Sequence, residues 1–318
     1  MHVIRALTPP PSPARKRSAE RKPVVVGVVQ HSWTADPVAL QAKLADAIGA
    51  AAAEGARLVV LPELTLSRYP ADVLPDGDGG EAAEDLGTGP TLAFARAAAA
   101  LHGVAVQASL FERSGGEDGL GLNTSVLVGP TGALVARTRK LHIPVTAGYY
   151  EDRYFRPGPA DEAPYPVHEV PGSGLRLGMP TCWDQWFPEV ARAYGLGGAD
   201  VVAYPTAIGS EPDHPEFDTE PLWRQVIVGN GIANGTFMVA ANRTGQEFRP
   251  DGAPGNRFYG SSFVSDPYGR ILAQAPRDEE AVLVAALDLD QRRDWLELFP
   301  FFRTRRPETY GSLAEPVA

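Results

Sequence analysis

The sequence predicts an α/β protein in which helices cover a mixed β-sheet, and three features of the pattern indicate this. Several short apolar runs rich in β-branched residues have the length of a single buried strand. Alanine-rich stretches of helical length separate some of these runs. Turns of the hairpin type join others, so some neighbouring strands are antiparallel and an all-parallel barrel is not expected.

The first half of the chain alternates strands with helices. Residues 24–29 are the first predicted strand, and a helix follows with Asp36 at its cap and Pro37 in its first turn. Gly55 ends that helix after an alanine-rich stretch. Next come a strand at 58–61, an alanine-rich helix at 91–102 and a strand at 104–110.

The second half mixes hairpins with further strand and helix units. Strands are predicted at 123–128 and 134–138, and Gly129-Pro130-Thr131-Gly132 between them has hairpin turn chemistry. Later strands are predicted at 175–181, 201–204, 237–241, 262–265, 271–274 and 281–287, and helices at 188–195 and 222–234. No repeat with a period of 20–50 residues is visible, so these elements are expected to form one domain over residues 23–290.

The two ends of the chain differ in composition from the middle. Residues 1–22 hold a proline-rich run and six basic residues against one acid, Glu20. This composition predicts a disordered basic tail, with a nucleic-acid or membrane-surface arm as the alternative. Residues 291–318 are rich in aromatic residues and then in arginine. We expect this extension to pack either on its own domain or on a neighbouring subunit.

Composition limits the partners and the cellular location. The net charge of −10 argues against nucleic acid as a partner, and no run of 18 apolar residues indicates a membrane helix. Cys182 is the single cysteine, so no internal disulfide can form and a reducing, cytoplasmic location is expected. The six histidines lack ligand spacing, and the sequence has no Walker A loop, His-Glu-x-x-His motif or Gly-x-Ser-x-Gly elbow. We therefore expect neither a metal nor a cofactor.

Three chemically reactive side chains each follow a predicted strand. Glu63 comes after the strand at 58–61, Lys140 after the strand at 134–138, and Cys182 after the strand at 175–181. Ligands of open α/β sheets gather beyond the carboxyl ends of the strands. Each residue alone has an ordinary explanation as a surface charge or a small buried side chain. Together they are the parts of a nucleophile, its base and an oxyanion partner.

Three segments containing these residues resemble the signatures of a known enzyme family. Leu61-Pro62-Glu63, residues 139–144 and residues 182–189 are similar, in order and spacing, to the signature segments of the nitrilase superfamily of carbon–nitrogen hydrolases. Within this similarity, which spans residues 24–290, the segments 148–151, 182–189 and 204–212 most closely resemble N-carbamoylputrescine amidases. The resemblance implies a four-layer α-β-β-α sandwich of two mixed sheets flanked by helices. It also implies subunit pairing, so a homodimer or larger homo-oligomer is expected.

The resemblance assigns a role to each residue of the site. Cys182 is expected to be the nucleophile, Glu63 the general base and Lys140 the group that stabilises the oxyanion, helped by the backbone N–H of Trp183. Glu151 matches the additional glutamate of the family, which positions substrate or water. Because a thiol has a pKa near 8.5, we expect the Lys140 ammonium to hold Cys182 as a thiolate.

The residues after Cys182 suggest which tail the amide or ureido substrate carries. Relatives that hydrolyse N-carbamoyl amino acids usually have an arginine clamp three residues after the cysteine, whereas this chain has Gln185. The other predicted substrate-binding residues are aromatic or acidic: Tyr150, Trp183, Asp184, Trp186, Glu189 and Glu211. This set favours a neutral or cationic tail, although the aromatic residues are also explained by core packing. Residues 213–220 are either a substrate loop or a solvated connector.

Two alternative functions remain at this point. The nearer one is the same chemistry on another substrate, as in a nitrilase, an aliphatic amidase or a β-ureido acid hydrolase. The more distant one is a non-catalytic binding or redox-sensing protein in which Cys182 is only a reactive thiol. A covalent acyl adduct on Cys182 formed from a ureido substrate would distinguish an enzyme from a sensor.

Overall fold

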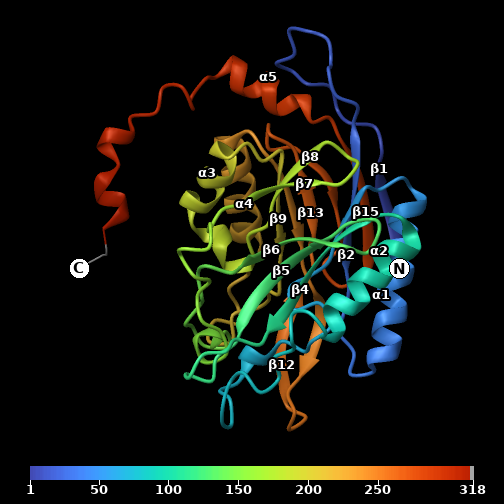
Figure 1. Ribbon diagram of the computed structural model, residues 1–318, viewed down its shortest axis with the longest axis vertical. Helices are drawn as coiled ribbons and strands as arrows, with labels where there is room; N and C mark the ends of the chain where they lie inside the picture. Colours follow the sequence, from blue (N-terminus) through green and yellow to red (C-terminus); the bar gives the residue numbers. More distant parts are fainter. Residues whose placement is uncertain (316–318) are drawn as a thin grey trace.

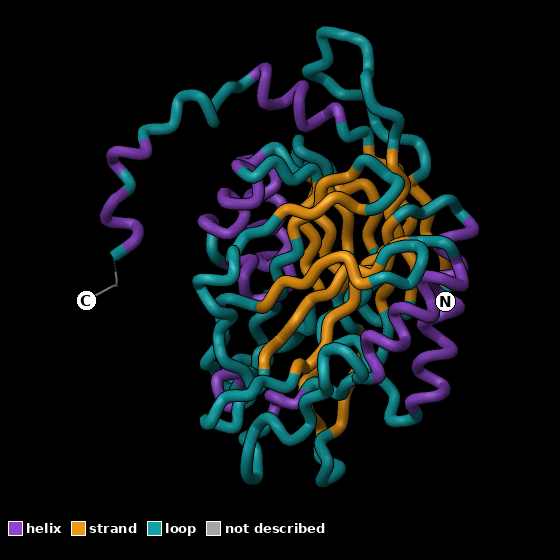
Figure 2. Tube along the Cα trace, viewed as in Figure 1, coloured by secondary structure: helices purple, strands orange, loops and turns teal. Residues whose placement is uncertain are grey.

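The computed structural model describes residues 1–315 and forms four layers. Two β-sheets pack face to face in the centre, and helices cover the outer face of each sheet (Figures 1 and 2). This is the α-β-β-α sandwich that the family resemblance implied, so that prediction is confirmed. None of the described helices is long and apolar enough to cross a membrane.

The first sheet has seven strands, and helices α1 (Pro37–Ala53) and α2 (Pro90–His102) cover it. Its strands, in spatial order, are β1 (His2–Ala6), β15 (Ala281–Leu287), β2 (Val24–Gln30), β3 (Leu58–Val60), β4 (Ala105–Glu112), β5 (Leu122–Val128) and β6 (Leu134–Arg139). Along β3, Leu58 and Val60 pack between the sheets, while Val59 packs under the helices. This alternation is why the buried strands read as continuous apolar runs.

The second sheet has six strands, and helices α3 (Pro188–Leu196) and α4 (Glu220–Asn234) cover its outer face. Its strands, in spatial order, are β14 (Ile271–Gln274), β13 (Phe263–Ser265), β10 (Phe237–Ala241), β9 (Val201–Pro205), β8 (Leu175–Gly178) and β7 (Val167–Val170). A separate hairpin pairs β11 (Thr244–Phe248) with β12 (Pro254–Tyr259). Trp223 of α4 is fully buried against the aromatic rings of Tyr259 and Phe263.

Local sequence signals predicted most of these elements to within a few residues. Asp36 caps α1, and its carboxylate accepts hydrogen bonds from the N–H groups of Val38 and Ala39 at 2.9 and 3.1 Å. Gly103 ends α2 in the left-handed conformation, with φ of 62°. Sequence patterns did not predict β1, β7, the β11–β12 hairpin or helix α5 (Asp290–Leu298).

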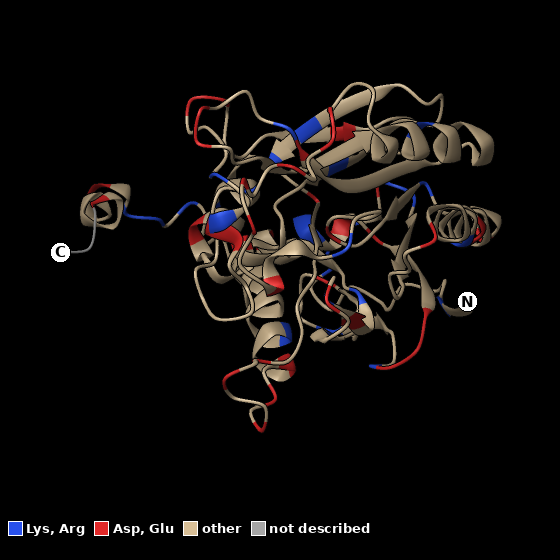
Figure 3. Cartoon of the chain, turned by 90° about the horizontal axis from the view of Figure 1, so that it is seen from below, with Lys and Arg blue, Asp and Glu red and all other residues tan. Residues whose placement is uncertain are grey.

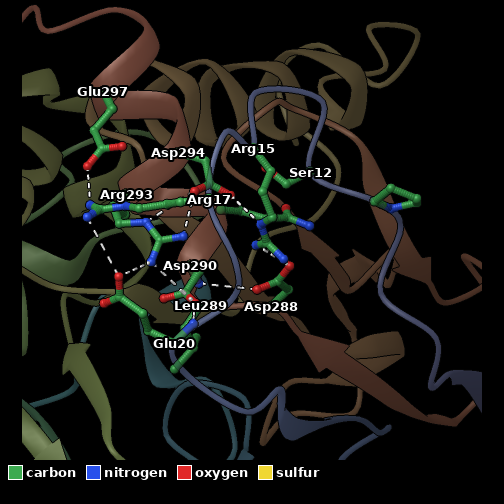
Figure 4. A network of polar contacts seen from close by, with 12 residues as sticks. Ser12, Arg15, Arg17, Glu20, Asp288, Leu289, Asp290, Arg293, Asp294 and Glu297 are labelled. Atoms are coloured by element: carbon green, nitrogen blue, oxygen red, sulfur yellow. Dashed lines mark hydrogen bonds and ion pairs between the residues drawn. The ribbon is translucent and has the colours of Figure 1, made fainter.

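The prediction of a disordered tail over residues 1–22 is wrong for this structure. Strand β1 pairs in parallel with β15 and extends the first sheet. Arg15 then forms ion pairs with Asp288 and Asp294 at 2.7 and 2.9 Å, and Arg21 contacts Asp200 and Asp290 at 3.0 and 3.2 Å. Figure 4 shows the part of this network around Arg15, in which the N-terminal segment lies against α5. The basic residues that suggested a solvated tail find acidic partners far away in the sequence.

The C-terminal extension behaves differently from the N-terminal segment. Trp295 of α5 packs edge-on against Tyr268, Phe299 and Phe301, so the start of the extension is anchored on its own domain. Beyond α5, residues 299–315, which we call the C-terminal arm, first pass Arg192 of α3 at Phe301 and Phe302 and then run away from the body of the protein (Figures 1 and 3). The last three residues of the predicted extension, 316–318, lie outside the described residues.

Candidate active site

The three residues singled out in the sequence lie at one edge of the sandwich, where strands of both sheets end. Glu63 follows β3, Lys140 follows β6, and Cys182 begins a short 3-10 helix, Cys182–Trp186, after β8. Strands β3, β4 and β6 run in one direction in the first sheet, and β8, β9 and β10 are parallel in the second. The carboxyl ends of these strands therefore lie in the same region of the protein, where the sequence led us to expect a site.

Lys140 joins two carboxylates in the interior of the protein. Its Nζ donates to Oε1 of Glu63 at 2.9 Å and to Oε2 of Glu151 at 2.6 Å, and all three side chains are buried. Burial lowers the pKa of Lys140, but attraction to Glu151 and Glu63 outweighs it and raises this pKa overall. Lys140 is therefore a permanent cation with fixed geometry.

Backbone and amide donors hold the Glu63 carboxylate from the other side. Nδ2 of Asn123, at the start of β5, donates to Oε1 of Glu63 at 2.7 Å. The backbone N–H of Ala207, just after β9, donates to Oε2 at 2.9 Å. Both carboxylate oxygens thus have defined partners, which fixes the orientation of the group.

Cys182 occupies a strained backbone position beside this cluster. Its φ of 38° lies in the left-handed region, which non-glycine residues rarely adopt. The N–H of Ala207 that donates to Glu63 also lies near the sulfur, where it favours the thiolate and so opposes the rise in the pKa of the thiol. The Cys182 side chain is only 6% exposed, but it lines a cavity.

The expectation that Lys140 holds Cys182 as a thiolate is wrong. Burial raises the pKa of the thiol well above its ordinary value, and the neighbouring Glu63 carboxylate raises it further. The Lys140 ammonium opposes both effects without overcoming them. Because the two carboxylates already exceed the single ammonium by one negative charge, a thiolate would add a second uncompensated negative charge. The resting thiol is therefore neutral, and its proton must leave during the reaction.

Glu151 is the second carboxylate of the cluster. The hydroxyl of Tyr69 donates to its Oε1 at 2.9 Å, and Lys140 donates to its Oε2. Burial raises the pKa of Glu151 to about 7, against the attraction of Lys140. This carboxylate therefore changes its charge near neutral pH.

A cavity of about 240 Å³ leads from Cys182 toward the surface. Trp183, Trp186 and Glu211, predicted from the sequence to contact substrate, line it together with Glu151. The remaining lining residues are Pro144, Thr146, Tyr149, Ile208, Thr219 and Leu222. The walls are thus apolar and aromatic with two acidic groups, and within residues 1–315 no lysine or arginine lines the cavity.

Four predicted substrate contacts do not line this cavity. The Asp184 carboxylate accepts hydrogen bonds from the N–H groups of Thr181 and His142, at 3.0 and 3.1 Å, and so holds the turn that carries Cys182. Gln185 is buried, and its Oε1 accepts from the indole of Trp223 at 2.8 Å. Gln185 therefore points into the interior and not into the cavity.

The other two predicted contacts lie on neighbouring surfaces. Glu189, in the first turn of α3, lines a separate gap between α3, α4 and the C-terminal arm. Tyr150 is half-buried, and its backbone N–H donates to the carbonyl of Ala71 at 2.8 Å. Short distance in sequence from Cys182 or Glu151 was a misleading guide for these residues.

Sequence reasoning also missed a buried ion pair that supports the cluster. Nη2 of Arg243 donates to the backbone carbonyls of Glu63 and Leu64 at 2.9 and 2.7 Å, and Nη1 pairs with Glu247. Oε2 of Glu247 in turn accepts from the N–H of Tyr69 at 2.9 Å. The pair holds the backbone of Glu63 directly and reaches Glu151 through Tyr69. No pattern of local spacing marks it, because its contacts span about 180 positions.

The carboxylate cluster does not resemble a metal site. Among residues 1–315, no group of three or more His, Cys, Asp or Glu side chains is placed to hold a metal ion. The oxygens of Glu63 and Glu151 accept from Lys140, Asn123, Ala207 and Tyr69. The donor set therefore favours organic acid–base chemistry.

Comparison with known proteins identifies the family of this chain. The chain is 35% identical to an N-carbamoylputrescine amidase from Arabidopsis thaliana over 92% of this chain and 96% of that protein. It is 33% identical to a citrullinase from Francisella tularensis over 91% of this chain and 98% of that protein. A carbon–nitrogen hydrolase from Helicobacter pylori, at 33% identity, superposes with a TM-score of 0.82 and covers 93% of this chain and 100% of that one. The carbon–nitrogen hydrolase family model matches residues 25–297, and the protein is a member of this family, an amidohydrolase of the nitrilase superfamily.

Proposed function

We propose that the protein hydrolyses a small ureido compound with a cationic tail, of the N-carbamoylputrescine class. The observation that carries this proposal is the lining of the cavity at Cys182. It presents Glu211 and two indole rings, and no cationic side chain that could pair with a substrate carboxylate. A volume of about 240 Å³ suits a short, unbranched molecule. The similarity to N-carbamoylputrescine amidases supports the same substrate class.

In the proposed mechanism, Glu63 removes the proton of Cys182 while the sulfur attacks the ureido carbonyl carbon. Proton removal and attack coincide because the resting thiol is neutral. Lys140 and the N–H of Trp183 stabilise the oxyanion. The Trp183 N–H lies in the first turn of its helix, where N–H groups have no intrahelical acceptor.

Collapse of this intermediate expels an amine or ammonia, which takes the proton from Glu63. The thioester left on Cys182 is then attacked by water, and Glu63 accepts a proton from that water. Glu151 positions the water or the substrate through its contacts with Lys140 and Tyr69. Hydrolysis of N-carbamoylputrescine in this way yields putrescine, ammonia and carbon dioxide.

A substrate panel tests the proposal. Ammonia release is compared for N-carbamoylputrescine, citrulline, N-carbamoyl-β-alanine and a short aliphatic amide under identical conditions. We expect the highest kcat/KM for N-carbamoylputrescine and the lowest among the ureido compounds for N-carbamoyl-β-alanine, whose carboxylate would face Glu211. Preference for the carbamoyl acid would contradict the proposal. Citrulline carries both charges and is the second candidate, because a citrullinase is 33% identical to this chain.

We further propose that the chain works as a cytoplasmic homodimer or larger homo-oligomer, in which the C-terminal arm contacts a second copy. The arm exposes Phe299 and Leu313 and lies across a gap of about 500 Å³ from α3 and α4. Apolar side chains in such an arm are stabilised by burial against a partner. Sedimentation of the intact protein should give at least a dimer, and Leu313→Asp should weaken it. A monomer at micromolar concentration would contradict this proposal.

A further inference from the structure

One segment of chain, residues 210–219 between β9 and α4, contributes to the wall of the substrate cavity. Glu211 and Thr219, near its two ends, both line the cavity. Oγ1 of Thr219 donates to Oε1 of Glu211 at 3.3 Å, so the two lining residues move together. The residues between them are exposed to solvent. The position of this segment therefore decides where the Glu211 carboxylate stands.

The segment has little packing behind it. On its far side lies a second hollow of about 390 Å³, and Phe217, Asp218 and Thr219 are among the residues that line it. Thr219 thus borders both spaces, and the segment is a thin partition between them. A partition without a packed core must be held in place by specific contacts.

One such contact is a two-pronged ion pair with the loop between β14 and β15. Nη1 and Nη2 of Arg277 donate to Oδ2 and Oδ1 of Asp218 at 2.8 and 2.9 Å. The hydrogen bond from Arg277 lowers the pKa of Asp218, so the pair is ionised at neutral pH. The Arg277 guanidinium lies over the ring of Tyr259, and the backbone carbonyl of Arg277 accepts from Oγ1 of Thr244 at 2.6 Å. The anchoring side of the pair is therefore fixed to the body of the protein.

We propose that Asp218 and Arg277 are positioning residues that set the affinity for the substrate tail. They act by fixing Thr219 and, through it, Glu211 at the outer end of the cavity. Neither residue lines the cavity itself. The inference rests on the proposed function in one respect, namely that a cationic tail is held at Glu211.

The test compares Arg277→Gln with a matched control in the same hollow. Arg257 pairs there with Asp278 at 3.5 Å, and its side chain does not bond the segment, so Arg257→Gln removes a charge from the same hollow, at a side chain that is more exposed than Arg277 (66% against 45%). For Arg277→Gln we expect KM for N-carbamoylputrescine to rise about fivefold and kcat to change less than about twofold. Turnover of a tail-less amide should not change. The double variant Asp218→Arg with Arg277→Asp should restore KM toward the wild-type value.

A second measurement does not depend on the substrate. Cys182 is the only cysteine, so its reaction with methanethiosulfonates can be followed directly by mass. The measured quantity is the ratio of the reaction rate with the cationic aminoethyl reagent to the rate with the neutral methyl reagent. This ratio should be higher in the wild type than in Arg277→Gln. If the wild type does not hydrolyse N-carbamoylputrescine, the proposed function is wrong, and this ratio still tests the positioning role of Asp218 and Arg277. Unchanged KM and an unchanged ratio in Arg277→Gln, or an equal effect of Arg257→Gln, would overturn the inference.

Discussion

The inner and outer halves of the substrate cavity are built in opposite ways. At the inner end, Glu63, Lys140 and Glu151 are buried and each has two or more polar partners. At the outer end, Glu211 is half-buried and sits on a thin segment anchored by a half-exposed ion pair. The inner half is rigid because every buried charge must be paired. The outer half can vary without disturbing the chemistry, which makes it the natural place to set substrate choice.

The largest effect should come from Cys182→Ala, which removes the sulfur from the inner half. Turnover should fall at least about 10⁴-fold, since loss of a nucleophile removes the covalent pathway. The melting temperature should stay the same or rise, because alanine removes a buried thiol from the neighbourhood of the Glu63 carboxylate. Ammonia release and thermal unfolding are the two measurements. Turnover near the wild-type rate would rule out Cys182 as the nucleophile.

Glu63→Gln should have the next largest effect. The amide keeps the size of the side chain and can still accept from Lys140, but it cannot take the thiol proton. We expect kcat to fall about 10²–10⁴-fold, the range for general-base catalysis. Circular dichroism should remain native. A variant that retains most of its kcat would show that another group removes the proton.

Glu211→Gln changes the outer half and should have a smaller, selective effect. KM for N-carbamoylputrescine should rise about tenfold, because the loss of one partly buried contact between charges weakens binding by about this factor. KM for a neutral amide of similar length should stay within about twofold. Equal effects on both substrates would indicate that Glu211 only shapes the cavity.

The smallest effect concerns the pH dependence of stability. Because the folded pKa of Glu151 is raised from 4.5 to about 7, its contribution to stability is fully present below pH 4.5 and is lost as pH rises through 7. The free energy of unfolding of the wild type relative to Glu151→Gln should therefore fall between pH 4.5 and 7 and then level off. Urea unfolding at several pH values measures it. A difference that rises with pH would mean that the folded protein lowers this pKa.

The same contrast explains what the sequence could predict. Glu63, Lys140 and Cys182 each follow a predicted strand, so the sequence indicated that they could converge, and the resemblance to the nitrilase superfamily assigned their roles. Arg243 and Glu247 support the same cluster, yet their partners lie far away in sequence and no local pattern marks them. Gln185 and Glu189 were misplaced because the 3-10 helix and α3 turn successive side chains to different surfaces.

The two ends of the chain were harder still to predict from composition. Residues 1–22 have the proline and charge content of a disordered segment. Their order in the structure depends on pairing with β15 and on acids near α5, such as Asp288 and Asp290. Composition reports only what a segment can do alone, whereas these contacts come from the opposite end of the chain.

The central claim is that a neutral Cys182 thiol becomes a covalent carrier when Glu63 takes its proton. The most direct test is the intact mass of the enzyme, quenched with acid during turnover of N-carbamoylputrescine, with Cys182→Ser and Glu63→Gln in parallel. We expect a carbamoyl-type adduct that maps to Cys182 in the wild type, and none on the cysteine-free Cys182→Ser variant. Steady turnover with an unmodified Cys182 at every time point, even when hydrolysis is slowed by low temperature, would contradict it.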